Sequence, residues 1–149
     1  MKTVSVIGDS TAAPESELYK VAYRAGRLIA KKGYAVVCGG MFGIMEGVAK
    51  GAKEAGGITV GILPGYNPEE SNSFIEIKLP TGLGHARNVI VVSSSTTVIA
   101  VGGGYGTLSE LGHALKLGKK VIGYKTWSVE GIENYEAVEE FLNAIDSNL

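Results

Sequence analysis

The stretch "AVGGGYGTLSELGHAL", residues 100–115, runs from an apolar segment through a glycine-rich turn into a helical pattern. Glycine occupies four of the five positions from 102 to 106. The first N–H groups of a helix have no partner within it, and the helix dipole places a partial positive charge there. A turn so free of side chains therefore lets the backbone approach an anion such as phosphate.

The rest of the chain repeats this order of strand, turn and helix. Short β-branched runs predict strands at residues 3–8, 34–40, 58–65, 74–79, 96–101 and 119–124. Apolar residues at helical spacing predict helices at residues 15–33, 44–57 and 85–94, a further helix from Thr107, and a last one from Asn134 to the end. Strands that alternate with helices pair in parallel, with right-handed crossovers. The sequence thus predicts one α/β domain over residues 1–149, a Rossmann-like, doubly wound, mostly parallel sheet of about six to seven strands with helices on both faces.

Composition excludes several classes of partner. With 149 residues, 45% of them hydrophobic, the chain has the size of one compact domain. The formal net charge of −1 gives nucleic acid no electrostatic attraction, and no apolar segment approaches the ~20 residues of a membrane-spanning helix. A single cysteine, Cys38, and an amino terminus without a signal-peptide pattern predict a cytoplasmic location.

Three small or glycine-rich turns follow predicted strands, at residues 8–10, 38–43 and 102–107. Ligands of open parallel sheets bind outside the carboxyl ends of the strands, so these turns are the candidate ligand site. None of them matches the dinucleotide spacing G-x-G-x-x-G or carries the lysine of a P-loop, and plain tight turns are the alternative interpretation. The candidate phosphate-binding residues are Gly8, Ser10, Gly39, Gly40, Gly43, Gly103, Gly104, Tyr105, Gly106 and Thr107. The phosphate is expected first at residues 103–107, because Glu46 would repel it from the second turn.

Other glycines have structural interpretations. Gly33, after two lysines, is predicted to end the first helix in the left-handed conformation. Gly43, Gly47 and Gly51 lie four residues apart, on one face of the second predicted helix. That spacing favours close packing against the sheet or a neighbouring helix without any ligand.

Glu110 has two interpretations that spacing alone leaves open. Thr107 and Glu110 match a capping box, in which the glutamate bonds back to the first N–H group of its helix. Alternatively, the carboxylate faces the ligand site. His85 and His113 are too far apart for a helical metal pair and Cys38 has no partner cysteine, so no metal site is expected.

The string "GGGYGTLSE", residues 102–110, resembles the signature P-G-G-x-G-T-x-x-E of the LOG family, the cytokinin-activating phosphoribohydrolases. "CGGMFGIMEGVAKGA", residues 38–52, is similar to the family's earlier turn G-G-G-x-x-G-x-M-G, and "GHARN", residues 84–88, lies where the family has an Arg-Lys pair. The motifs keep the family's order and similar spacing. On these motifs the chain is identified as a member of the LOG-like (SLOG) superfamily.

The resemblance implies a Rossmann-like homodimer or higher homo-oligomer that hydrolyses the N-glycosidic bond of a nucleoside 5′-monophosphate. It implies Arg87 and Glu110 as the catalytic pair, with the glycines of residues 103–106 and Thr107 as the phosphate cradle. A carboxylate beside C1′ would stabilise the developing ribosyl cation and orient a water, while the arginine holds the substrate. This reaction requires no cofactor.

Three departures resemble a shorter branch of the superfamily. Gly102 replaces the signature proline, Asn88 replaces the lysine, and Glu46 stands where glycine is common. This branch includes the molybdenum cofactor carrier proteins and relatives of the DNA-processing Rossmann domain. It implies that the same cradle, with Asn88 among the ligand-binding residues, holds a phosphate-bearing ligand such as molybdenum cofactor without cleaving it. A non-catalytic carrier or sensor is therefore the alternative to an enzyme.

Overall fold

The computed structural model describes the whole chain, residues 1–149, and contains seven strands and five α-helices. The strands are β1 Thr3–Gly8, β2 Ala35–Cys38, β3 Thr59–Leu63, β4 Ile77–Pro80, β5 Thr97–Val101, β6 Lys120–Tyr124 and β7 Ile132–Tyr135. The helices are α1 Glu17–Lys31, α2 Ile44–Glu54, α3 Arg87–Ser93, α4 Tyr105–Lys116 and α5 Val138–Asn148, with short 3₁₀ turns at Pro68–Glu70 and Gly84–Ala86.

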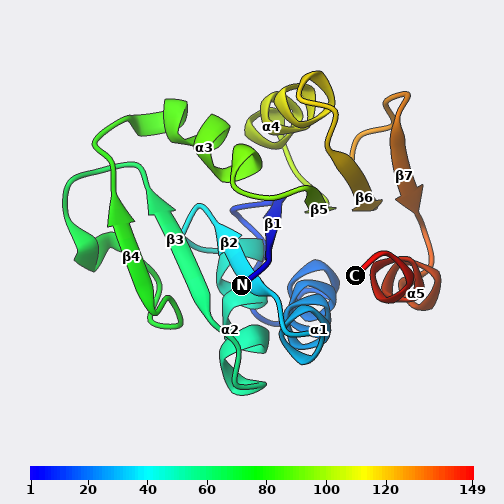
Figure 1. Cartoon of the computed structure of the whole chain (residues 1–149), viewed down its shortest axis with the longest axis horizontal. Helices are drawn as coiled ribbons and strands as arrows, with labels where there is room; N and C mark the ends of the chain where they lie inside the picture. Colours follow the sequence, from blue (N-terminus) through cyan, green and yellow to red (C-terminus); the bar gives the residue numbers. More distant parts are fainter.

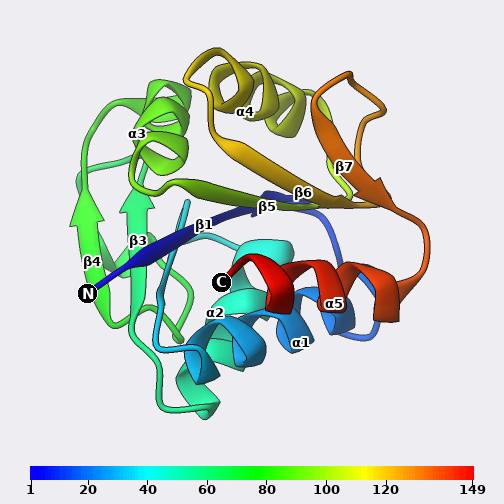
Figure 2. The same cartoon turned by 45° about the vertical axis from the view of Figure 1, so that its right-hand side comes forward.

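The strands form one sheet in the order β4-β3-β2-β1-β5-β6-β7, and every neighbouring pair is parallel. Helices α1, α2 and α5 cover one face and α3 and α4 the other (Figures 1 and 2). The predicted Rossmann-like, doubly wound α/β fold is confirmed. The chain winds outward from β1 to β4 and then returns to β5 on the other side of β1, so the topological switch point lies between β1 and β5.

Two apolar layers hold the sheet between its helices. The larger core includes Val4, Val36 and Ile99 of the sheet with the inner faces of α1, α2 and α5. The smaller core includes Ile7 and Ala100 with residues of α3 and α4. Strand β5 is buried along its whole length, which explains the unbroken apolar run from Val98 to Val101.

The glycines of α2 serve close helix packing, as their spacing predicts. A Cβ on Gly51 would overlap the carbonyl oxygen of Tyr23 in α1, and one on Gly47 would lie 2.9 Å from the carbonyl oxygen of Tyr19. Gly26 of α1 makes the reciprocal approach to the backbone of α2. Gly33 has φ +80°, in agreement with its predicted left-handed conformation at the end of α1.

Several predicted boundaries are wrong. Strand β4 begins at Ile77 rather than Phe74, and helix α2 ends at Glu54 rather than Gly57. Helix α4 begins at Tyr105 rather than Thr107, with Gly104 as a cap that has no side chain. Helix α5 begins at Val138 rather than Asn134, because residues 132–135 form the edge strand β7, which was not predicted. None of the helices combines the length and the hydropathy that crossing a membrane requires.

Candidate functional site

A cleft of about 450 Å³ opens at the carboxyl ends of the central strands, beside the switch point. All the predicted site residues except Gly40 and Gly43 line it: Gly8, Ser10, Gly39, Arg87, Asn88, Gly103, Gly104, Tyr105, Gly106, Thr107 and Glu110. They come from the turns after β1, β2 and β5, from the start of α3 and from the first half of α4. The fold therefore brings together segments that are widely separated in the sequence.

Gly40 and Gly43 lie outside the lining and have packing reasons to be glycine. A Cβ on Gly40, at φ +77°, would press on Leu63 and on the backbone of β3. A Cβ on Gly43, at φ +65°, would overlap the backbone of Asp9 and Ser10. These two glycines thus let the second turn lie against its neighbours.

Glu46 is likewise absent from the cleft. Its carboxylate accepts a hydrogen bond of 2.8 Å from the hydroxyl of Tyr19, in the packed face between α1 and α2. The expected repulsion between Glu46 and a phosphate therefore does not set the preference between the two glycine-rich turns.

The backbone at the start of α4 presents free hydrogen-bond donors. The N–H groups of residues 103–107 have no acceptor within the chain, whereas the flanking N–H groups of Gly102 and Leu108 donate to Tyr124 and Gly104. No side chain caps this helix. Unpaired N–H groups at a helix start, together with the positive end of the helix dipole, favour an anion at this position.

The glycines of this turn differ in what requires them. Gly103 has φ +122°, and a Cβ on it would overlap the side chain of Thr107. Gly104 and Gly106 have open space where a Cβ would project, so nothing in the chain itself demands glycine there. Their lack of side chains leaves the donors accessible from the cleft.

Arg87 and Asn88 enter the cleft from the first turn of α3. The guanidinium of Arg87 donates to the side-chain oxygen of Asn88 and, at 3.4 Å, to the carbonyl oxygen of Gly39. Arg87 is 8% exposed, and its Nε has no hydrogen-bond partner. A buried cation with an unused donor in a cleft is suited to an anionic ligand.

Glu110 lies in the cleft and does not cap α4. Thr107 is already inside the helix, so the capping-box interpretation of Thr107 and Glu110 is wrong. Burial raises the pKa of the Glu110 carboxyl to about 7, although the nearby Arg87 acts to lower it. The carboxyl therefore changes charge in the neutral range, where a proton-transfer group is useful.

The thiol of Cys38 lies close enough to Arg87 and Glu110 for their charges to act on it. It is fully buried, and burial raises its pKa to about 11. A thiol in that state is a packing group rather than a nucleophile.

Several lining residues were not predicted: Asp9, Thr11, Met45 and His85. One carboxylate oxygen of Asp9 accepts hydrogen bonds from the N–H (2.8 Å) and the hydroxyl (2.6 Å) of Thr11, which fixes the side chain at the end of β1. The position of Asp9 directly after a predicted strand, within the turn at residues 8–10, was the available signal. Nowhere in the chain do three or more His, Cys, Asp or Glu residues gather as a metal-binding group.

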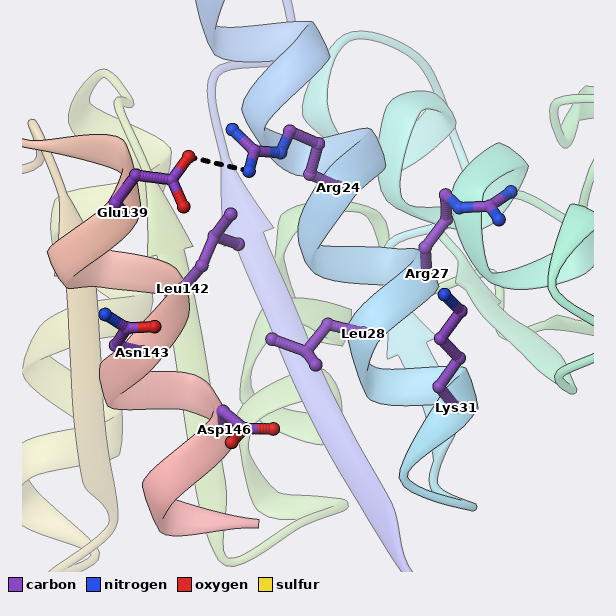
Figure 3. Close-up of a pocket in the computed structure, with 8 residues that line it drawn as sticks. All are labelled: Arg24, Arg27, Leu28, Lys31, Glu139, Leu142, Asn143 and Asp146. Atoms are coloured by element: carbon purple, nitrogen blue, oxygen red, sulfur yellow. Dashed lines mark hydrogen bonds and ion pairs between the residues drawn. The ribbon is translucent and has the colours of Figure 1, made fainter.

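A second hollow, a groove of about 340 Å³, lies between α1 and α5, on the sheet face that α1, α2 and α5 cover (Figure 3). Arg24 of α1 forms an ion pair of 2.7 Å with Glu139 of α5, and Leu28 and Leu142 face each other between the helices. Arg27 and Lys31 also line the hollow, and Figure 3 shows their side chains next to each other on the side of α1 away from α5. This groove lies apart from the glycine-rich turns.

The fold and the cleft at the carboxyl ends of the central strands define a doubly wound protein with glycine-rich turns at its switch point. The chain belongs to the SLOG cluster4 family, whose sequence profile matches residues 1–147.

Two proteins of known sequence are similar to the chain to different degrees. A protein of Archaeoglobus fulgidus, whose name states no function, is 48% identical over 141 residues, which is 94% of this chain and 91% of the relative. The Oryza sativa subsp. japonica protein named "Probable cytokinin riboside 5'-monophosphate phosphoribohydrolase LOGL5" is 28% identical over 138 residues. The match to the rice protein covers 90% of this chain but 56% of the relative.

Solved structures show the same architecture. The molybdenum cofactor binding protein of Rippkaea orientalis is 37% identical with a TM-score of 0.88, over 99% of this chain and 98% of that one. The molybdenum cofactor carrier protein of Chlamydomonas reinhardtii is 31% identical with a TM-score of 0.85, over 99% and 98% of the two chains. DNA processing protein A of Helicobacter pylori, 18% identical with a TM-score of 0.70 over 99% and 82%, shares the fold alone.

Proposed function

We propose that the protein binds a small phosphate-bearing ligand in the cleft, with the phosphate at the start of α4. The observation that carries this proposal is the run of N–H groups at residues 103–107, which donate to nothing in the chain. Backbone donors at a helix start are a common phosphate site because they combine hydrogen bonds with the helix dipole. The buried guanidinium of Arg87, with its unpartnered Nε, supplies a second group suited to an anion in the same cleft.

We propose molybdenum cofactor, carried rather than used in a reaction, as the first ligand to test. This cofactor is a pterin with a terminal phosphate, and the free donors at residues 103–107 fit such a phosphate. The likeness to the Rippkaea and Chlamydomonas proteins, which extends over nearly the whole of each chain, supports this choice. In this proposal the chain holds the phosphate at the start of α4, and Arg87 and Asn88 contact the ligand from the start of α3.

A phosphoribohydrolase is the second candidate, favoured by the presence of Arg87 and Glu110 in one cleft. Hydrolysis of a nucleoside 5′-monophosphate breaks the bond between C1′ and the base, and a water oxygen then bonds to C1′. Above pH 7 the Glu110 carboxyl is ionised, so it can stabilise the ribosyl cation and accept a proton from that water. The departing base takes up one proton, the proton that Glu110 accepts from the water replaces it, and ribose 5-phosphate remains.

Two measurements separate these candidates. Native mass spectrometry of freshly purified protein, isolated without oxygen, is expected to show a retained pterin if the protein is a carrier. Incubation with AMP and modified-adenine monophosphates tests catalysis, with Glu110→Gln as the control. Release of free base by the wild type and not by Glu110→Gln favours the hydrolase, whereas a retained pterin without base release favours the carrier.

We also propose that the protein forms a homo-oligomer through an apolar strip beside α3. Ile77 and Leu79 of the edge strand β4 point to the sheet face that α3 covers, and both are exposed, as are Val89 and Ile90 on the outer side of α3. A second copy of the chain is the occupant that we propose for this strip, because exposed apolar side chains on an edge strand and on a helix that covers the same sheet face are typical of subunit interfaces. The net charge of −1 supports no nucleic-acid partner.

A further inference from the structure

The loop between β6 and β7, residues 125–131, donates two side-chain hydrogen bonds to the glycine-rich turn at residues 102–107. The hydroxyl of Thr126 donates a hydrogen bond of 2.7 Å to the carbonyl oxygen of Gly102. The indole N–H of Trp127 donates one of 3.0 Å to the carbonyl oxygen of Gly104. Two consecutive residues of one loop thus hold two carbonyl groups of the turn that carries the free donors.

The bond to Gly102 fixes the direction of the next N–H group, and the bond to Gly104 adds to the one of 3.1 Å that the same oxygen accepts from the N–H of Leu108. A trans peptide unit is planar, so its C=O and its N–H point in opposite directions. The carbonyl of Gly102 shares its peptide unit with the N–H of Gly103, and the carbonyl of Gly104 shares its own with the N–H of Tyr105. When the oxygens are held from the side of the β6–β7 loop, the two N–H groups point the opposite way. Neither N–H has an acceptor in the chain, and both residues line the cleft.

Aromatic packing reinforces the second of these contacts. The rings of Trp127 and Tyr105 lie 5.8 Å apart between centroids, tilted by 30°. Tyr105, the first residue of α4, is still 84% exposed beside this ring. The indole therefore contacts the start of α4 twice, at the ring of Tyr105 and at the carbonyl group of Gly104.

We propose that Thr126 and Trp127 are positioning residues, which aim the N–H groups of Gly103 and Tyr105 at the phosphate of the ligand. The proposal rests on the proposed function, because it assigns these donors to a phosphate. Neither Thr126 nor Trp127 lines the cleft, so they act through the backbone and not by contact with the ligand.

The test uses ¹⁵N-labelled protein titrated with inorganic phosphate and followed by the amide signals of residues 103–107. In the wild type, the signals of Gly103 and Tyr105 are expected to shift and saturate. Trp127→Phe keeps an aromatic ring but loses the N–H donor, and Thr126→Val keeps the shape of the side chain but loses the hydroxyl. Each is expected to raise the Kd for phosphate about five-fold, the usual worth of one hydrogen bond. Thr126→Ser, which restores the donor, is expected to bind phosphate like the wild type.

Urea unfolding of each variant supplies the second readout. If the two residues only stabilise the loop, Thr126→Val and Trp127→Phe will lower the free energy of unfolding while the Kd for phosphate stays at the wild-type value. That result overturns the positioning role and leaves the phosphate site intact. A wild type whose amide signals do not respond to phosphate overturns the site itself, and the positioning role with it.

Discussion

Arg87 and burial act in opposite directions on the carboxyl group of Glu110, which lies in the same cleft as Arg87. The guanidinium of Arg87 acts to lower the pKa of Glu110, but the loss of hydration in the cleft outweighs it and the pKa rises to about 7. Burial lowers the pKa of Arg87 in turn, while Glu110 acts to raise it. The carboxyl group of Glu110 therefore gains and loses its proton near neutral pH.

The raised pKa predicts a pH-dependent stability. The unfolded protein loses the Glu110 proton near the ordinary value of 4.5 and the folded protein near 7, so the free energy of unfolding falls as pH rises between these values. The fall is at most about 3–4 kcal/mol, since the pKa rises from 4.5 to about 7 and one pKa unit corresponds to ~1.4 kcal/mol. In Glu110→Gln, which cannot ionise, this component is expected to vanish. Urea unfolding from pH 4.5 to 8 measures it, and parallel curves for the two proteins would show that Glu110 is not the titrating group.

A negative charge at the start of α4 is predicted to block the phosphate site without unfolding the protein. In Gly106→Asp the new side chain enters open space, and an acidic residue is favourable in the first turn of a helix. Its carboxylate would occupy and repel the position proposed for the phosphate, so the affinity for AMP or inorganic phosphate is expected to fall at least about ten-fold.

Gly112→Asp is the matched control for that variant. Gly112 lies in the same helix, is exposed and has open space for a Cβ, but it does not line the cleft. Calorimetric titration of both variants should therefore separate local repulsion from the change in net charge. Equal affinities in the two variants would argue against a phosphate at residues 103–107.

Gly51 is predicted to be among the positions least tolerant of alanine. A Cβ there would overlap the carbonyl oxygen of Tyr23, so α1 and α2 would have to separate. We expect Gly51→Ala to lower the free energy of unfolding by about 2–4 kcal/mol, as for other overpacked sites. Gly112 lies in α4, and a Cβ on it would meet no atom of a neighbouring segment. Gly112→Ala is therefore expected to raise the free energy of unfolding by about 0.5–1 kcal/mol. Urea denaturation that ranks the two variants in the opposite order would contradict the packing account.

The apolar strip beside α3 predicts the effect of a charge on assembly. Ile90→Asp is expected to convert a homo-oligomer into a monomer, because it places a carboxylate in an apolar interface. Val129→Asp is the control, since Val129 in the β6–β7 loop has 37% exposure against 38% for Ile90 and lies outside the strip. Light scattering during size-exclusion chromatography gives the masses, and an unchanged mass for Ile90→Asp would remove the strip from the interface.

The sequence predicts the sheet better than its edges. Strand β5 and the left-handed Gly33 follow directly from an apolar run and from the need for a residue without Cβ. Strand β7 was missed because it is a short, partly exposed edge strand whose residues 132–135 show no strong apolar pattern. Part of the helix predicted from Asn134 therefore belongs to this strand.

Within the site, sequence motifs locate the turns but not the contacts between them. The capping-box spacing of Thr107 and Glu110 is misleading because α4 begins earlier, at Tyr105, where no residue type marks a cap. Gly40 and Gly43 match the same motif as Gly39, yet only the three-dimensional packing shows that they face the backbone of other segments. The support that Thr126 and Trp127 give to the turn depends on the pairing of β5 with β6, which local sequence does not reveal.

The position of a bound phosphate tests the central claim most directly. A crystal structure of the protein with molybdenum cofactor or AMP is expected to place phosphate oxygens about 3 Å from the backbone nitrogens of residues 103–107. A phosphate bound elsewhere, for example beside Arg27 and Lys31 in the groove between α1 and α5, with the start of α4 free, would contradict the account.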